Sequence, residues 1–279
     1  MAIKDILLPL VGKPGAAAIA AIEKCTAVAG AIGARVTAMA VEQDILVRPK
    51  VAISSDLENT AAAEAGRSVS NAHDLLTVFD TAATRFGVRN ERWLQRFAAA
   101  DIPANLAVWA RLKDLSLVPV KPHDDQSEIV ERLIFESGRP VLMCPEEFAG
   151  ELAVAFNNVL IAWDHTAPAA RAVADALPWL RAAANVRIIT ATDNNTPAEL
   201  LSGTALVSHL AEHGIEATFE MIKIDGSSVG KVFEAYVEAN SIDLLVMGAY
   251  RHSRLNEIVW GGATKTVIGR PPCWVMMSH

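Results

Sequence analysis

Asp243-Leu244-Leu245-Val246-Met247-Gly248-Ala249-Tyr250-Arg251-His252-Ser253 is the stretch on which the fold prediction depends. Its first half is a short apolar run of the kind that forms a buried parallel strand. Gly248 ends that strand, and Gly261 and Gly262 open a helix predicted at 263–268. A flexible loop that brings unpaired N–H groups to a helix N-terminus suits an anion, because the helix dipole favours negative charge there. The stretch therefore indicates a nucleotide phosphate site.

The order strand, helix, strand occurs in both halves of the chain, which indicates an internal repeat. The first half has predicted strands at 6–10, 36–41, 89–97, 115–118 and 141–143, and predicted helices at 16–32, 71–86 and 102–112, with an irregular stretch at 42–70. The second half has predicted strands at 159–163, 186–191, 217–224, 244–247 and 274–276, and predicted helices at 167–183, 197–213, 229–239 and 263–268. This alternation is typical of parallel sheets with right-handed crossovers.

We therefore expect an α/β fold made of two tandem, doubly wound, five-stranded parallel-sheet domains. The segment 145–151 is charged and contains both Pro and Gly, so it is the predicted boundary. The predicted domains are residues 1–147 and residues 151–279. In such a fold, ligands bind outside the carboxyl ends of the strands, where the chain direction switches.

The composition describes a compact chain with a large core. Of the 279 residues, 52% are hydrophobic and 20% are charged, and the net charge is −7. That charge offers no general attraction to DNA, RNA or an anionic membrane. Cys25, Cys144 and Cys273 lie far apart in apolar surroundings, so we expect buried reduced thiols. No signal-like segment or bilayer-length apolar run is present, and we expect a cytoplasmic protein.

The glycine stretch resembles that of the universal stress protein family. Nucleotide-binding members carry Gly, two residues, Gly, nine residues, then Gly followed by Ser or Thr, and they end in a Pro-led apolar strand. Gly248 and Gly261 match the first and last glycines at the family's spacing, and 271–277 resembles the closing strand. Arg251 replaces the second glycine, and Gly262 replaces the hydroxyl residue. Gly262 keeps its N–H, and the Arg251 guanidinium could pair with a phosphate.

The resemblance implies a tandem member of this family whose halves pack through their last strands with pseudo-twofold symmetry. It implies ATP or AMP as the ligand, with Mg²⁺ only as part of bound ATP, and Asp164 in contact with the nucleoside. A local alternative is that Asp164 caps the next helix. Thr264 has similar alternatives, a hydroxyl that faces solvent or one bonded to its own helix. The implied nucleotide-binding residues are Ala162, Trp163, Asp164, Ala191, Met247, Gly248, Arg251, Ser253, Gly261, Gly262, Ala263 and Thr264.

The first half lacks the features of a second nucleotide site. Its fourth strand leads into 118–125, where two prolines lack N–H donors and no glycine occurs before Gly138. Leu10 is taken as the counterpart of Asp164. We expect this half to be a scaffold or a partner surface. The triplet 123–125, His-Asp-Asp, is expected to be a solvated loop and not a metal site, because three adjacent residues rarely bind one ion without distant ligands.

A serine hydrolase is an alternative from another class. Residues 226–230, Gly-Ser-Ser-Val-Gly, fit the nucleophile-elbow pattern between a strand and a helix. Ser228 would then need an acid such as Asp243 and a base such as His252 or His279. The simpler interpretation is that Ser227 or Ser228 caps the helix.

The main functional hypothesis is a stress-response protein that binds an adenine nucleotide as a regulatory ligand in the second domain. No base or nucleophile indicates rapid ATP hydrolysis. The competing hypothesis is a family member without nucleotide that acts as an interaction module for a protein partner. Beyond the internal pair of domains, a homodimer is left open.

Overall fold

The computed structural model describes residues 2–44, 55–121, 126–146, 155–193, 197–250 and 260–279, in which strands and helices alternate as predicted. The strands are β1 (Asp5–Leu10), β2 (Arg35–Gln43), β3 (Asn90–Phe97), β4 (Leu115–Val120), β5 (Val141–Pro145), β6 (Asn158–Ala162), β7 (Asn185–Ala191), β8 (Ala217–Ile222), β9 (Leu244–Gly248) and β10 (Trp274–Ser278). The helices are α1 (Ala16–Ala31), α2 (Ser55–Arg85), α3 (Ile102–Ala110), α4 (Gln126–Glu136), α5 (Ala167–Leu180), α6 (Pro197–Glu212), α7 (Val229–Ala239) and α8 (Trp260–Gly269), with a short 3-10 helix, η1 (Ala99–Asp101), before α3.

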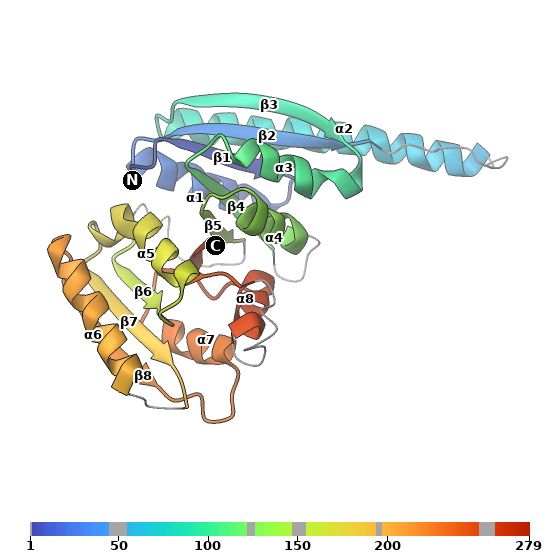
Figure 1. Cartoon of the computed structure of the whole chain (residues 1–279). Helices are drawn as coiled ribbons and strands as arrows, with labels where there is room; N and C mark the ends of the chain where they lie inside the picture. The colour runs from blue at the N-terminus through green and yellow to red at the C-terminus, as the bar shows by residue number, and fades with distance from the viewer. Residues whose placement is uncertain (1, 45–54, 122–125, 147–154, 194–196, 251–259) are drawn as a thin grey trace.

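The strands form one continuous sheet in the order β3-β2-β1-β4-β5-β10-β9-β6-β7-β8. Each half therefore has the same internal order, in which its third, second, first, fourth and fifth strands lie side by side. Neighbouring strands within a half are parallel, and β5 and β10 join the halves in antiparallel fashion. The predicted α/β fold class is confirmed, and the two five-stranded units share one sheet (Figure 1).

The register of β5 and β10 fits the pseudo-twofold symmetry that the resemblance implied. Leu142 lies opposite Met276, while Val141 lies opposite Met277 and Met143 lies opposite Val275. Ser116 pairs with Val141 in the first half and Leu245 pairs with Val275 in the second, so Val141 and Val275 are equivalent positions. Strands β5 and β10 are equivalent strands that pair antiparallel, and the Leu142–Met276 pair lies at the centre of the pairing. An antiparallel contact between equivalent strands is what a twofold arrangement requires.

One hydrogen-bond arrangement occurs in both halves. Asp114 Oδ2 accepts hydrogen bonds from the N–H groups of Lys4 and Asp5, at 2.8 and 3.0 Å. Asp243 Oδ2 accepts hydrogen bonds from the N–H groups of Asn157 and Asn158, at 2.9 and 2.8 Å. In each half, the aspartate before the fourth strand thus holds the start of the first strand. This match aligns residue 5 with residue 158 and gives the residue-by-residue equivalence of the halves.

Helices cover both faces of the sheet (Figure 1). Ile22 of α1 and Val173 of α5 belong to one buried apolar cluster, together with residues of α2 and α6. Leu133 of α4 and Phe233 of α7 belong to a second cluster, together with residues of α3 and α8. The inner strands β4, β5, β9 and β10 are buried at every residue. Burial on both faces explains their continuous apolar sequences.

Helix α2 corrects the prediction of an irregular stretch at 42–70. Strand β2 continues to Gln43, and α2 begins at Ser55 and not at 71. None of its residues from Thr60 to Asn71 is buried, and α2 projects beyond the rest of the first half (Figure 1). This part is rich in Ala and Glu, which favour a helix, but it has no apolar stripe because it does not pack on the core. Periodicity alone could not detect it.

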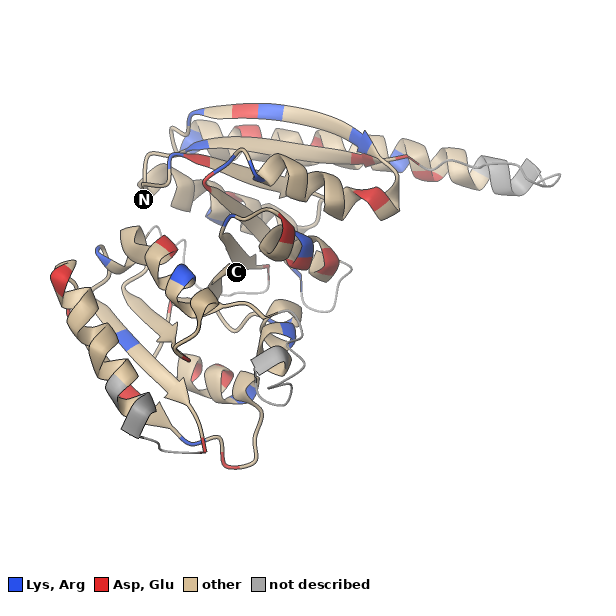
Figure 2. Cartoon of the chain, in the orientation of Figure 1, with Lys and Arg blue, Asp and Glu red and all other residues tan. Residues whose placement is uncertain are grey.

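The burial of the cysteines and the distribution of the charged residues agree with the sequence analysis. Cys25, Cys144 and Cys273 are free and buried, as predicted, and burial raises the thiol pKa of Cys25 and of Cys273. Lys and Arg are interspersed with Asp and Glu over both halves (Figure 2). Among the described helices, none has the length and apolar character needed to cross a membrane.

Candidate functional site

The second half brings the two parts of the predicted site to one edge of the sheet. Strands β6 and β9 are parallel neighbours, and Ala162 pairs with Met247 near their carboxyl ends. Gly248 follows Met247 directly, and Asp164 follows Ala162 by two residues. The carboxyl ends of adjacent parallel strands are where ligands bind in doubly wound folds. The chain thus places Asp164 and the start of the glycine loop next to each other.

Gly248 has a packing reason to be glycine. A Cβ atom at this position would lie 2.5 Å from the backbone nitrogen of Ala169, 2.7 Å from the carbonyl carbon of Pro168 and 2.9 Å from the Pro168 Cβ. These atoms belong to the first turn of α5, which crosses directly over the end of β9. Any side chain at 248 would push α5 away, so this glycine is needed for packing whether or not a ligand binds.

Asp164 holds the turn that leads into α5. Its Oδ1 accepts hydrogen bonds from the Thr166 N–H at 3.2 Å and from the Thr166 hydroxyl at 2.5 Å. Thr166 is the N-cap residue, and its hydroxyl oxygen accepts the Ala169 N–H at 3.4 Å. The local alternative was therefore close but misplaced by two residues, because Asp164 supports the cap and Thr166 provides it.

Tyr250 is a site residue that the sequence analysis missed. Its hydroxyl oxygen is buried and has no hydrogen-bond partner among the described residues. Burial raises the pKa of Tyr250, and the nearby negative charge of Asp164 raises it further. The hydroxyl therefore stays protonated at neutral pH and keeps a hydrogen to donate. The available signal was an aromatic hydroxyl two residues after Gly248, at the carboxyl end of a central strand.

Thr264 connects the loop to α8. Its side chain is buried, and its hydroxyl oxygen accepts the Tyr250 N–H at 3.3 Å. This contact differs from both alternatives for Thr264, a hydroxyl that faces solvent and a hydroxyl bonded to its own helix. The contact fixes the end of β9 relative to the first turns of α8.

The start of α8 leaves room beside its backbone. Gly261 and Gly262 lie in the first turn of the helix, where backbone N–H groups lack partners within the helix. Within the described ranges, no atom outside the backbone of α8 lies within 4 Å of a Cβ built at Gly262, which is exposed, whereas Ala263 is buried. An incoming group can thus reach the backbone at Gly262 but not the Ala263 side chain. Arg251 and Ser253 lie outside the described residues.

The other predicted residues line the base of this edge. Trp163 is buried, and its indole Nε1 donates a hydrogen bond to the Ser202 hydroxyl of α6 at 2.8 Å. The Trp163 carbonyl oxygen accepts the Thr190 hydroxyl at 2.8 Å. Ala162 and Ala191 are buried at the ends of β6 and β7. These contacts fix the ends of β6 and β7. The residues therefore border the candidate site mainly through their backbone, because their side chains are buried.

The equivalence of the halves corrects the counterpart of Asp164. Since residue 5 aligns with residue 158, Val11 and not Leu10 is equivalent to Asp164. The error was a shift of one residue in an apolar strand that carries no internal marker. Ile6 pairs with Leu115 as Val159 pairs with Leu244, so Pro119 is equivalent to Gly248. The first half therefore lacks both the carboxylate and the glycine. Residues 123–125 lie outside the described residues.

The hydrolase pattern at 226–230 has a structural explanation at each position. Gly226 has a φ of 71°, and a Cβ at Gly230 would lie 2.8 Å from Thr266 of α8. Ser228 caps α7, and its hydroxyl oxygen accepts the Lys231 N–H at 3.3 Å. Asp243 stands before β9, at the opposite end of the sheet from Ser228, where it holds the start of β6. The structure supports the capping interpretation and separates the proposed acid from the serine.

Comparisons with known proteins agree with this fold. Residues 155–279 match the model of the universal stress protein family. The universal stress protein Slr1230 of Synechocystis sp. (strain ATCC 27184 / PCC 6803 / Kazusa) is 29% identical over 144 residues, which are 50% of this chain and 46% of that protein. The match thus spans about half the length of this curated relative.

Solved structures match nearly the whole chain. A universal stress protein from Archaeoglobus fulgidus DSM 4304 has a TM-score of 0.67 at 14% identity and covers 98% of this chain and 95% of its own. The cytoplasmic domain of a prokaryotic cation chloride cotransporter has a TM-score of 0.52 at 12% identity and covers 99% and 96%. At these identities the likeness shows the fold alone, and the same fold serves proteins with different names.

Proposed function

Because the chain belongs to the universal stress protein family, we propose that its second half binds an adenine nucleotide, ATP or AMP, as a regulatory ligand of a stress-response protein. The observation that carries the proposal is the meeting of three features at one edge of the sheet. These are the Asp164 carboxylate, the buried Tyr250 hydroxyl beside it, and the first turn of α8, where the described residues leave room at Gly262.

Each feature suits one part of a nucleotide. The N–H groups of Gly261, Gly262 and Ala263 and the charge of Arg251 would hold the phosphates, because unpaired donors and a positive helix end favour anions. Asp164 would accept a hydrogen bond from the ribose, since a carboxylate only accepts. The Tyr250 hydroxyl, which stays protonated, would donate a hydrogen bond to the nucleotide. Mg²⁺ would accompany ATP through its phosphates and would add positive charge there.

The test is nucleotide binding by the full-length protein and by two glycine variants. Gly262→Val adds a branched side chain where none of the described side chains would clash with it, so we expect normal folding and at least about a tenfold loss of ATP affinity, measured by calorimetry. Gly269→Val is the matched control, because Gly269 lies at the other end of α8 and also has open space around it. Equal ATP affinity in the two variants would contradict the proposed phosphate site.

A direct search for a resident ligand complements this titration. Mass spectrometry of small molecules released on denaturing freshly purified protein should show ATP or AMP. If the protein releases no nucleotide and shows no binding of millimolar ATP in calorimetry, the result favours the competing hypothesis, an interaction module. That hypothesis already accounts for part of the site, because Gly248 and Asp164 have packing and turn roles that need no ligand.

A further inference from the structure

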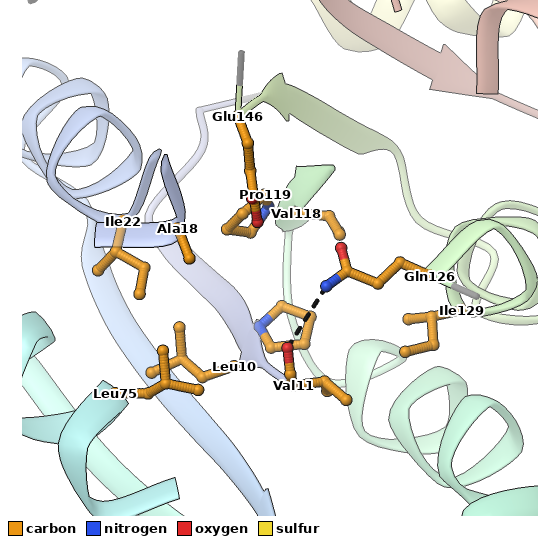
Figure 3. Close-up of a pocket in the computed structure, with 11 residues that line it drawn as sticks. Leu10, Val11, Ala18, Ile22, Leu75, Val118, Pro119, Gln126, Ile129 and Glu146 are labelled. Carbon is orange, nitrogen blue, oxygen red and sulfur yellow. Dashed lines mark hydrogen bonds between the residues drawn. The ribbon is translucent and has the colours of Figure 1, made fainter. Parts of the chain in front are cut away.

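The first half lacks the carboxylate and the glycine of the candidate nucleotide site, but one of its helices reaches the loop that follows β9. Val11 and Pro119 stand at the positions of Asp164 and Gly248. Figure 3 shows both among apolar side chains such as Leu10. Helix α4 of the first half nevertheless contacts α8 of the second, close to the end of β10. The first half can therefore act on the candidate site through α4.

His279 connects α4 to the start of the glycine loop. Its imidazole ring packs edge-to-face on Phe135 of α4, with the ring centroids 4.9 Å apart and the ring planes at 72°. Its Nδ1 lies 3.0 Å from the carbonyl oxygen of Ala249, the residue between Gly248 and Tyr250. A carbonyl oxygen only accepts, so this contact requires the hydrogen on Nδ1. One side chain thus touches both the first half and the backbone of the loop.

The end of β10 holds both backbone groups of Ala249. The Ala249 N–H donates to the Ser278 carbonyl at 2.8 Å, and the Ala249 carbonyl accepts from His279. Ala249 is fully buried, and an unpaired carbonyl at a buried position is costly. This carbonyl belongs to the same peptide group as the Tyr250 N–H, which donates to Thr264 at 3.3 Å. The His279 donor therefore helps to fix the peptide group from which the Tyr250 side chain projects.

The first half shows that this strand end does not need a histidine for its own pairing. The equivalence of β5 and β10 puts Pro145 in the place of His279. Val120 takes the place of Ala249, and its carbonyl accepts the backbone N–H of Glu146 at 2.8 Å. A backbone donor thus satisfies this carbonyl in the first half. Beside the candidate site, the donor is a side chain that also packs on the other half.

We propose that His279 is a positioning residue through which the first half holds the nucleotide loop in its binding conformation. The inference rests on the proposed nucleotide site. Packing on Phe135 fixes the imidazole, and the imidazole fixes the Ala249 carbonyl. The loop then presents Tyr250 in one orientation. A change at Phe135, which lies in the half without the carboxylate and the glycine, should therefore alter nucleotide affinity in the other half.

The test combines amide hydrogen exchange of the nucleotide-free, full-length protein, measured by NMR, with ATP titration by calorimetry. His279→Phe keeps a ring against Phe135 and removes the donor, while Phe135→Leu removes the ring on which the imidazole packs. In each variant the amides of Ala249 and Tyr250 should exchange about two- to tenfold faster, and ATP should bind about two- to tenfold more weakly.

A conservative variant separates the two contacts of the imidazole. His279→Asn keeps an N–H donor near the position of Nδ1 and should restore most of the protection that His279→Phe loses. Because it has no ring, Phe135→Leu should have no further effect on ATP affinity when combined with it. Equal exchange in His279→Asn and His279→Phe would show that the Nδ1 donor does not hold the loop.

Phe97→Leu is the matched control. Phe97 is also a half-buried phenylalanine of the first half that packs against the same apolar cluster as Phe135, but it lies on the edge strand β3. This control should lose stability in urea as Phe135→Leu does and should leave the Ala249 and Tyr250 amides unchanged. Equal exchange in the two leucine variants, or faster exchange in Phe135→Leu with unchanged ATP affinity, would overturn the inference. If the wild type binds no ATP, the proposed function fails, and the exchange rates alone decide whether His279 positions the loop.

Discussion

Replacing Gly248 with alanine is predicted to destabilise the protein even when no nucleotide is present. The new Cβ would lie 2.5 to 2.9 Å from three atoms of Pro168 and Ala169, whereas unstrained contacts of carbon lie at about 3.5 to 4.0 Å. Two of the three atoms are backbone atoms of α5, which cannot rotate away. Overpacking of a buried site costs about 1 to 3 kcal/mol, and the backbone contacts place this variant near the upper value. The expected loss in the free energy of unfolding is therefore about 3 kcal/mol.

Urea unfolding followed by far-ultraviolet circular dichroism measures this loss, with nucleotide removed beforehand. The control is Gly262→Ala, the same change at an exposed glycine whose Cβ would contact no described residue outside the helix backbone. Alanine favours a helix over glycine, so the control should be unchanged or more stable by up to about 1 kcal/mol. A Gly248→Ala variant as stable as the wild type would refute the packing argument and leave ligand binding as the reason for this glycine.

Two further predictions concern the amino ends of the strands. Asp114→Ala and Asp243→Ala each remove the acceptor of two backbone N–H groups at equivalent positions, so each should lower the free energy of unfolding by a similar amount, about 1 to 3 kcal/mol, in the same urea assay; a large loss in only one variant would contradict the equivalence of the halves. The Asp5 carboxylate pairs with Arg35 and with the buried Lys113. Burial acts to raise the pKa of Asp5, but the hydrogen bonds and positive charges of these two partners outweigh it, so the pKa lies below 3.8. The stability that this pairing contributes is therefore present above pH 3.8 and is lost as the pH falls through the lower, folded-state pKa. Asp5→Asn should therefore be less stable than the wild type at neutral pH, and the difference should shrink on acidification. A difference that stays constant with pH would show that the carboxylate charge is not involved.

Much of the fold could be predicted because the inner strands are buried on both faces. Strands such as β4 and β9 therefore have continuous apolar sequences, and the helices between them have amphipathic ones. The same logic failed for the outer part of α2, since a helix that packs on nothing has no apolar stripe to detect. It also failed at Leu10 and Val11, because two apolar neighbours in a strand give no sign of which is equivalent to Asp164.

The candidate site was less predictable, because a residue type does not reveal its partner. Asp164 and Gly248 were found from the sequence, but only the structure shows that one holds Thr166 and that the other makes room for α5. Tyr250 was missed, because its importance depends on burial beside Asp164 and not on its place in a motif.

The sequence by itself determined the two repeated α/β units and the edge of the sheet at which a ligand could bind. Apolar period, glycine position and strand order are local properties, and they can be recognised along the chain. Only the tertiary structure decided the register in which β5 and β10 pair, and that Val11 and Pro119 stand at the positions of Asp164 and Gly248. Those properties depend on register and burial, which arise when residues far apart in the sequence come into contact.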